Sequence, residues 1–236
     1  MKEIYLSEHL ETQSKEQSSQ SKYNFFWGIL LIVAGSLLAT VNAFFLILGV
    51  AGAIPLFIRG TRQANQSYIY DQGVNGEEIL RGKLRSTLSD DYTAFYNVPL
   101  NPGDVDCVVV GPSGIYAFEV KNHKGEIVYN EGGWSQIKVG RGGTAYKGHL
   151  SNPTGQLGKY IRQLREKFEE KGVGVWVNGF VVFTNPEARV IIEAEMKKIK
   201  AVTVGEVSAL FERQNPTLHN DKRVAVESAL MALKKC

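Results

Sequence analysis

The chain has 236 residues, enough for one domain of about 150 to 180 residues and a further segment. Apolar residues make up 44% and charged residues 22%, which excludes wholesale disorder and collagen-like structure. Two cysteines, Cys107 and Cys236, are too few for a disulfide framework or a four-thiolate zinc site. The formal net charge of +3 is too small to predict a nucleic-acid partner on its own.

The first 22 residues are polar and of mixed charge, and they end in a run rich in serine and glutamine. Such a composition lacks the apolar side chains that a packed core needs. It predicts a disordered polar tail over residues 1–22.

Residues 23–59 predict a membrane segment. No charged residue occurs over the 34 positions from 25 to 58. A single helix of that length would extend about 51 Å, whereas the hydrocarbon core of a bilayer is roughly 30 Å thick. The apolar stretch is also longer than a signal-peptide core of about 7–15 residues.

Two arrangements of the membrane segment remain open: a single tilted span, or a hairpin of helices 25–41 and 43–58. Lys22 precedes the segment, and Arg59 and Arg62 follow it. Because basic flanks favour the cytoplasmic side, both flanks would lie in the cytoplasm, which only a hairpin allows. A buried hairpin in a soluble protein is less favoured, since the rest of the chain supplies its own core.

The remaining elements alternate between helical and strand patterns. A helix is expected over 74–88, strands over 92–98, 105–110 and 115–121, a small hairpin over 127–129 and 136–139, a helix from 153 to about 171, and a strand over 175–184. Together they predict an α/β domain over residues 70–210 with a mixed central sheet. Residues 211–236 are expected to add an amphipathic helix packed on the domain.

Two acidic residues are expected to lie side by side on the hairpin of residues 105–121. If the turn is centred on Pro112 and Ser113, paired residue numbers sum to 225, so Asp106 lies opposite Glu119. Their Cβ atoms would be roughly 4.5–5.5 Å apart, and like charges at that distance repel. A divalent cation between them removes the repulsion, and oxygen-only ligands favour Mg²⁺ or Mn²⁺.

Lys121 lies two residues beyond Glu119 and therefore projects from the same face of the strand. An ammonium group there can orient an attacking water or neutralise charge that develops on a phosphate. The same register places Lys121 opposite Asp104, so a cross-strand ion pair is the alternative interpretation.

Two helices offer further side chains to this site. Glu77 falls on the apolar stripe of the helix over 74–88, where a carboxylate is costly unless it is paired or binds metal. The alternative is an acid that favours the start of a helix. Gln156 and Tyr160 are four residues apart beside the core stripe of the next helix, so both can reach one edge of the site.

As a set, these residues resemble the PD-(D/E)xK nuclease superfamily and, more narrowly, its nuclease-related domain family, NERD. The matching pieces are Gly73-Val-Asn-Gly-Glu77, Asp106 with the strand and turn that follow it, Phe118-Glu-Val-Lys-Asn122, Asn152-Pro153-x-x-Gln156 and Gly179-Phe-Val-Val-Phe-Thr184. The resemblance implies a restriction-endonuclease-like αβββαβ core. Val105 stands where the superfamily name has a proline.

The resemblance also implies residue roles. Asp106 and Glu119 would hold Mg²⁺ or Mn²⁺, with Glu77 as a direct or water-mediated ligand. Lys121 would position the nucleophilic water, and Gln156 would orient the lysine or touch the nucleic-acid backbone.

Nucleic-acid contacts are expected from Tyr160 and from the basic residues Lys138, Arg141 and Lys147, which lie on or beside a glycine-rich loop. His123 and His149 are interpreted as polar surface residues. Trp134 and Trp176 are interpreted as packing residues.

The sequence thus predicts a membrane-anchored, Mg²⁺-dependent nuclease that hydrolyses nucleic-acid phosphodiesters, with DNA as the expected substrate. Its nuclease-like domain would face the cytoplasm, and residues 25–58 would contact the lipid bilayer. The first alternative is a non-catalytic module that binds nucleic acid or protein on the same fold. The second is a membrane protein in which the polar residues form only ion pairs.

Overall fold

The computed structural model describes residues 1–7, 9–140, 142–212 and 218–234. The chain divides into two compact units. One comprises Met1–Glu8 and Asn75–Cys236, and the other comprises His9–Val74. The first unit contains every strand among the described residues, and the second is helical.

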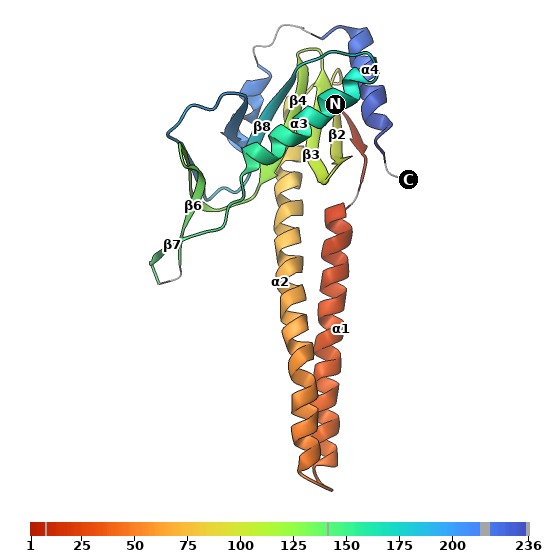
Figure 1. Cartoon of the computed structure of the whole chain (residues 1–236), viewed down its shortest axis with the longest axis vertical. Helices are drawn as coiled ribbons and strands as arrows, with labels where there is room; N and C mark the ends of the chain where they lie inside the picture. Colours follow the sequence, from red (N-terminus) through yellow and green to blue (C-terminus); the bar gives the residue numbers. More distant parts are fainter. Residues whose placement is uncertain (8, 141, 213–217, 235–236) are drawn as a thin grey trace. The chain divides into compact units, whose positions relative to one another are not determined.

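A six-stranded mixed sheet forms the centre of the first unit, in the order β1-β2-β3-β4-β8-β10. Its strands are β1 (Lys2–Tyr5), β2 (Thr93–Leu100), β3 (Gly103–Gly111), β4 (Gly114–Lys121), β8 (Val177–Phe183) and β10 (Ile199–Thr203). β2, β3 and β4 pair antiparallel, whereas β8 joins β4 in parallel and β10 joins β8 in parallel. A parallel neighbour requires a crossover, and α3 provides it between β4 and β8 (Figure 1).

Apolar side chains cover both faces of this sheet. On one face lie α3 (Pro153–Glu169) and α4 (Asn220–Met231), which contribute Leu157, Leu164 and Val226 to the core. On the other face lie the last residues of α2 (Phe44–Thr87) and the 3₁₀ helix η1 (Val204–Leu210). The order of α2, β2, β3, β4, α3 and β8 confirms the expected αβββαβ core and mixed sheet.

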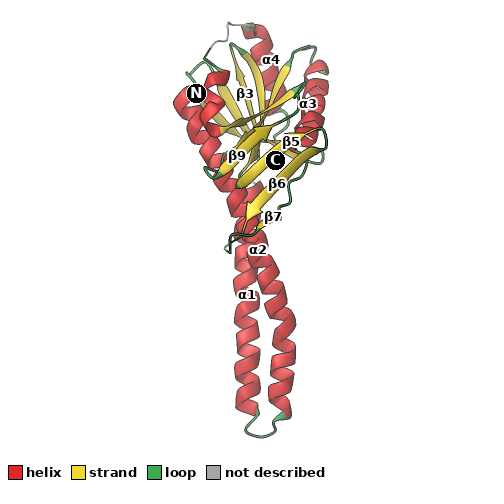
Figure 2. Ribbon diagram, turned by 90° about the vertical axis from the view of Figure 1, so that its left-hand side faces the viewer, coloured by secondary structure: helices red, strands yellow, loops and turns green. Residues whose placement is uncertain are grey.

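A second, four-stranded sheet has the order β7-β6-β5-β9 and lies beside the first in Figure 2. It contains the hairpin of β5 (Gly125–Asn130) and β6 (Gly133–Val139), with β7 (Ala145–Lys147) and β9 (Ala188–Ile192) at its edges. β5 begins four residues after β4 ends, so this sheet continues directly from the strand that carries Glu119 and Lys121.

The beginning of the chain is ordered, in contrast to the expected disordered tail. β1 pairs in parallel with β2, and the side chain of Leu6 is buried. Arg85 donates two hydrogen bonds of 2.9 and 2.8 Å to the Glu3 carboxylate. Four residues carry too short a pattern to predict a strand, and the pairing partner lies about 90 residues further along the chain.

The helical unit is a hairpin of α1 (His9–Leu38) and the first part of α2, and not one continuous helix. Gly35 and Gly49 bring the two helices into close contact, since a Cβ on Gly49 would lie 2.7 Å from the Leu31 carbonyl oxygen. Both helices are long and apolar enough to cross a membrane. α2 also continues without a break into the helix that was expected separately over 74–88.

Candidate active site

The acidic site begins where β3 and β4 separate. Every residue pair between them sums to 225, as the sequence predicts, from Gly111 and Gly114 to Cys107 and Phe118. The ladder stops one position before Asp106 and Glu119. There the Val120 N–H donates to Asp106 Oδ2 at 2.5 Å, so the carboxylate takes up the backbone donor at the end of the ladder.

Glu119 is the most deeply buried member of the site, with 1% of the residue exposed. Lys121 Nζ donates to Glu119 Oε1 at 2.6 Å, so the ion pair of Lys121 lies along its own strand. The other carboxylate oxygen, Glu119 Oε2, is buried and accepts no hydrogen bond within the described part of the chain. A buried carboxylate oxygen without a donor is costly unless a cation or a water binds it.

Glu77 reaches the site because α2 passes close to the ends of β4 and β8. A Cβ on Gly76 would lie 2.9 Å from Asn122 Cβ and 3.0 Å from Thr184 Oγ1. A larger residue at position 76 would therefore push the helix away from the sheet. The glycine lets the helix carry Glu77 to a buried position beside these strand ends.

Burial, followed by the charges of neighbouring carboxylates, raises the pKa of the three acids. Burial and the negative charge of Asp104 raise the pKa of Glu77 to about 7. Burial, followed by the charges of Glu119 and Glu77, raises the pKa of Asp106 well above its usual range. Burial also raises the pKa of Glu119, although Lys121 opposes the change. Each of the three acids is therefore easier to protonate than a carboxyl group in water, and a cation at the site would oppose this change.

Lys121 stays protonated in this setting. Burial alone would lower the pKa of its ammonium group, but the charges of Glu119 and Asp106 outweigh burial and raise it. The group is therefore a fixed positive charge next to the acids, and it is not a proton acceptor at neutral pH.

α3 borders the site with the two residues that the sequence placed there. The Tyr160 hydroxyl donates to the Pro102 carbonyl oxygen at 2.7 Å, at the turn between β2 and β3. Burial and the Glu119 charge raise the pKa of Tyr160, while a hydrogen bond with Gln156 opposes the rise. Both side chains therefore lie on the side of α3 that faces the acids.

Two of the three basic residues expected to contact nucleic acid, Lys138 and Lys147, lie on the second sheet. Lys138 is on β6 and pairs in register with Tyr146, while Lys147 is exposed on β7. Arg141 lies outside the described residues. Their role in binding stays a prediction.

Two neighbours of the site were not assigned to it from the sequence. Asp104 was considered only as a partner for Lys121, yet its charge raises the pKa of both Glu77 and Glu119. His123 was interpreted as a surface residue but is partly buried, and burial together with the charge of Lys121 lowers its pKa. His123 lies two residues after Lys121 in the sequence, and this spacing could have indicated that it lies near the site.

The donor set fits a magnesium ion better than a metal with many protein ligands. Within the described residues, no group of three or more His, Cys, Asp or Glu side chains is arranged to hold a metal ion. Mg²⁺, however, commonly uses one or two carboxylates and keeps several waters. Asp106 and Glu119 Oε2 would serve as those carboxylates, with Glu77 acting through water.

Residues 72–184 match the family model of NERD, the nuclease-related domain. The match starts just before Glu77, ends at Thr184 and includes Asp106, Glu119 and Lys121. No curated protein and no solved structure matches the chain.

Proposed function

Because residues 72–184 match the nuclease-related domain family, we propose that the chain is a Mg²⁺-dependent nuclease acting on nucleic-acid phosphodiesters, with DNA as substrate. The observation that carries the proposal is the crowding of Glu77, Asp106 and Glu119, whose pKa values are all raised. Such crowding costs stability and is common where acids bind metal or take part in catalysis.

Asp106 and Glu119 would hold the Mg²⁺, and the ion would supply Lewis acidity and a more acidic water. Asp106 is held for this role by the Val120 N–H, and Glu119 is held by Lys121. Lys121 places a fixed positive charge where negative charge develops on the phosphate. The Pro102 carbonyl oxygen holds the Tyr160 hydroxyl at the border of the site, one helical turn from Gln156.

The test is cleavage by the full chain in detergent micelles, because β1 belongs to the sheet of the domain and a fragment starting near residue 60 would lose it. Plasmid, linear and single-stranded DNA and RNA are incubated with Mg²⁺, with Mn²⁺ or with chelator. We expect cleavage only with metal. Asp106→Asn should reduce it by at least about 100-fold, because the carboxylate that would hold the ion is lost.

Glu131→Gln is the matched control, because it removes one negative charge from an exposed turn. The assignment is wrong if Asp106→Asn cleaves as fast as this control.

The alternative, a non-catalytic binding module, is favoured by one observation. Lys121 already binds Glu119 Oε1 at 2.6 Å and so occupies one oxygen of a proposed metal ligand. If Mg²⁺ raises the melting temperature of the full chain but no substrate is cleaved, the binding module is the better description.

We also propose that the hairpin anchors the protein in a membrane and that the nuclease-like domain lies in the cytoplasm. Large apolar side chains along the hairpin are exposed, among them Leu37, Val41 and Ile47. Contiguous apolar surface of this kind requires a covering partner, and a bilayer provides it.

The chain connectivity supports an even number of crossings. β1 precedes the hairpin, β2 follows it, and the two strands pair in one sheet. The two ends of the hairpin must therefore lie on the same side of the membrane. A cysteine introduced at Val41, in a Cys236→Ser background, should react with an impermeant maleimide added outside intact cells, and one at Glu131 should not. Labelling of position 131 from outside would contradict the cytoplasmic assignment.

A further inference from the structure

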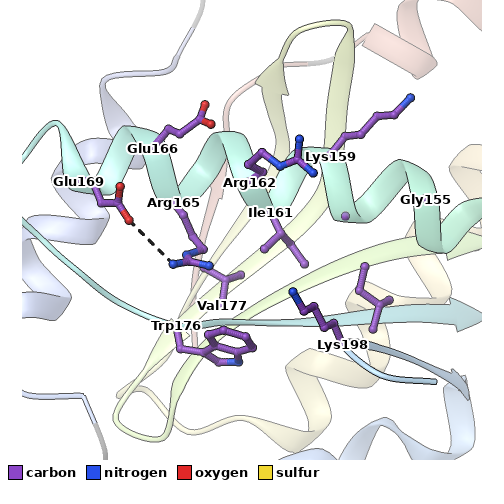
Figure 3. A pocket seen from close by; sticks show the side chains of 12 residues that line it. Gly155, Lys159, Ile161, Arg162, Arg165, Glu166, Glu169, Trp176, Val177 and Lys198 are labelled. Carbon is purple, nitrogen blue, oxygen red and sulfur yellow. Dashed lines mark ion pairs between the residues drawn. The ribbon is translucent and has the colours of Figure 1, made fainter. Parts of the chain in front are cut away.

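A hollow of about 650 Å³ lies beside α3, between this helix and the sheet strands β8 and β10. Its volume is in the range of pockets that bind small organic ligands, about 300–1,000 Å³. Figure 3 shows Arg162 and Arg165 on the helix side, with Trp176 and Lys198 on the sheet side. None of these side chains belongs to the acidic site.

The hollow and the acidic site lie on different sides of α3. Gln156 and Tyr160 face the acids, whereas Lys159 and Arg162 line the hollow. At 100° per residue, the side chains of Gln156 and Arg162 point about 120° apart around the helix axis. One helix therefore borders both places.

Trp176 is unusual in being 58% exposed, although the sequence suggested a packing residue. The Arg165 guanidinium lies 5.6 Å from the centre of its ring, which holds the indole in place by a cation–π contact. An exposed indole next to a cation is a surface on which a nucleic-acid base can stack.

The charges around the indole favour an anionic ligand. Lys159, Arg162, Arg165 and Lys198 line the hollow, against Glu166 and Glu169. Arg165 forms a long ion pair of 3.9 Å with Glu169. In the described part of the chain the other three cations form no ion pair and are exposed, so they are available to phosphates.

The floor of the hollow is apolar and open. Ile161, Val177 and Ile199 contribute to it, and Gly155 and Gly158 add no side chains on the helix side. A Cβ on Gly158 would meet only Ile199 Cδ1, at 3.5 Å. An apolar floor between cations suits an aromatic ring that carries a phosphate.

From these features we propose that the hollow, here called the Trp176 groove, binds an unpaired segment of nucleic acid. One base stacks on Trp176, and the neighbouring phosphates contact Arg162, Lys159 and Lys198. This inference rests on the proposed nuclease function and specifies its substrate as nucleic acid with a single-stranded part. Duplex bases are stacked on each other and cannot offer a face to the indole.

The test measures binding apart from cleavage, using fluorescence anisotropy of the full chain in detergent with chelator present. The probes are a labelled oligothymidylate, an abasic oligomer of the same length, a duplex and a glutamate-rich peptide. We expect the oligothymidylate to bind at least about fivefold more tightly than the other three, because base–aromatic stacking adds to the phosphate contacts.

Trp176→Ala should weaken oligothymidylate binding about tenfold and leave abasic binding unchanged, whereas Trp176→Phe should keep most of the affinity. Gly158→Leu, which fills the floor, should act like Trp176→Ala. Lys171→Ala is the matched control, since it removes an exposed cation of the same region outside the groove. Arg162→Ala should weaken both oligomers and lower the salt dependence of binding.

Equal binding of the oligothymidylate by wild type and Trp176→Ala would overturn the inference. So would a preference for the duplex, equal binding of the abasic oligomer, or tight binding of the acidic peptide, which would indicate a protein partner. Cleavage without Trp176-dependent binding would leave the nuclease proposal intact and remove only the groove. Trp176-dependent binding without any cleavage would support the groove and contradict the nuclease proposal.

Discussion

Two regions of the molecule hold polar side chains in partly buried positions, but in opposite ways. In the polar half of the hairpin, residues 9–24 and 59–74, most cross-helix hydrogen bonds join neutral groups, although the Asp71 carboxylate accepts one from Ser14. Asn24 Nδ2 donates to Gln63 Oε1 at 2.6 Å, and Ser21 Oγ donates to the Gly60 carbonyl oxygen at 2.9 Å. Gln17 Oε1 is buried and lacks a hydrogen-bond partner among the described residues.

In the acidic site, by contrast, Glu77, Asp106 and Glu119 repel one another, and Glu119 Oε2 has no donor within the described residues. Paired neutral groups stabilise a helix contact and give it specificity. Crowded acids destabilise the fold unless a ligand neutralises them. The difference agrees with the proposal that the acidic site, and not the hairpin, binds a metal ion.

The largest effect is expected from removing an acid that would hold the metal. Glu119→Gln should abolish Mg²⁺-dependent cleavage, a loss of at least about 100-fold, because the buried oxygen that lacks a donor is replaced by a neutral amide. Initial rates on linear DNA measure the effect. A Gln63→Leu change in the hairpin should leave the cleavage rate unchanged. Equal losses of cleavage rate in the two variants would contradict a specific role of the acidic site.

Magnesium should stabilise the protein through the acidic site alone. At ten times its Kd, a ligand that binds only the folded state adds about 1.4 kcal/mol, or roughly 3–6 °C in Tm for a chain of this size. Thermal unfolding of the full chain in micelles, with Mg²⁺ or chelator, measures the shift. In Asp106→Asn the Mg²⁺-dependent increase in Tm should disappear. If the increase remains, Mg²⁺ binds at another site.

Glu77→Gln should stabilise the metal-free protein above neutral pH. Between the usual carboxyl pKa of 4.5 and the raised value of about 7, folded Glu77 holds a proton that the unfolded chain has released. Stability therefore falls as pH rises through this range, by up to about 3 kcal/mol, and stays reduced above it. Glutamine has no such loss.

Chemical denaturation of wild type and Glu77→Gln at pH 4 and pH 8, with chelator, tests the sign. The variant should match wild type at pH 4 and exceed it at pH 8. A variant that is less stable at pH 8 than at pH 4, in parallel with wild type, would show that Glu77 is not the group responsible.

The smallest effect is expected in the hairpin. Gln63→Leu removes the hydrogen bonds of Gln63 with Asn24 and Gln20, but both partners keep access to water. The cost should be about 1 kcal/mol, because each neutral hydrogen bond has a modest net value. Proteolysis of the hairpin in micelles measures it, and a loss of cleavage activity in this variant would contradict a purely structural role.

Much of the site could be predicted from the sequence because it depends on local geometry. The turn at Pro112 and Ser113 fixes the register of β3 and β4, and alternation along the strands then puts Asp106, Glu119 and Lys121 on one side. The apolar stripe of α2 likewise indicated that Glu77 is buried. For the ion pair of Lys121, the sequence offered only the cross-strand partner Asp104, whereas the structure pairs Lys121 with Glu119 on its own strand.

The sequence by itself determined the order of helices and strands, the register of the acidic hairpin and the apolar segment, since each is written in a local period or turn. Only the tertiary structure decided that β1 completes the sheet, that Gly76 brings Glu77 to the strand ends and that Trp176 is exposed above a groove. These features depend on contacts between residues that are far apart along the chain, and no local pattern records such contacts.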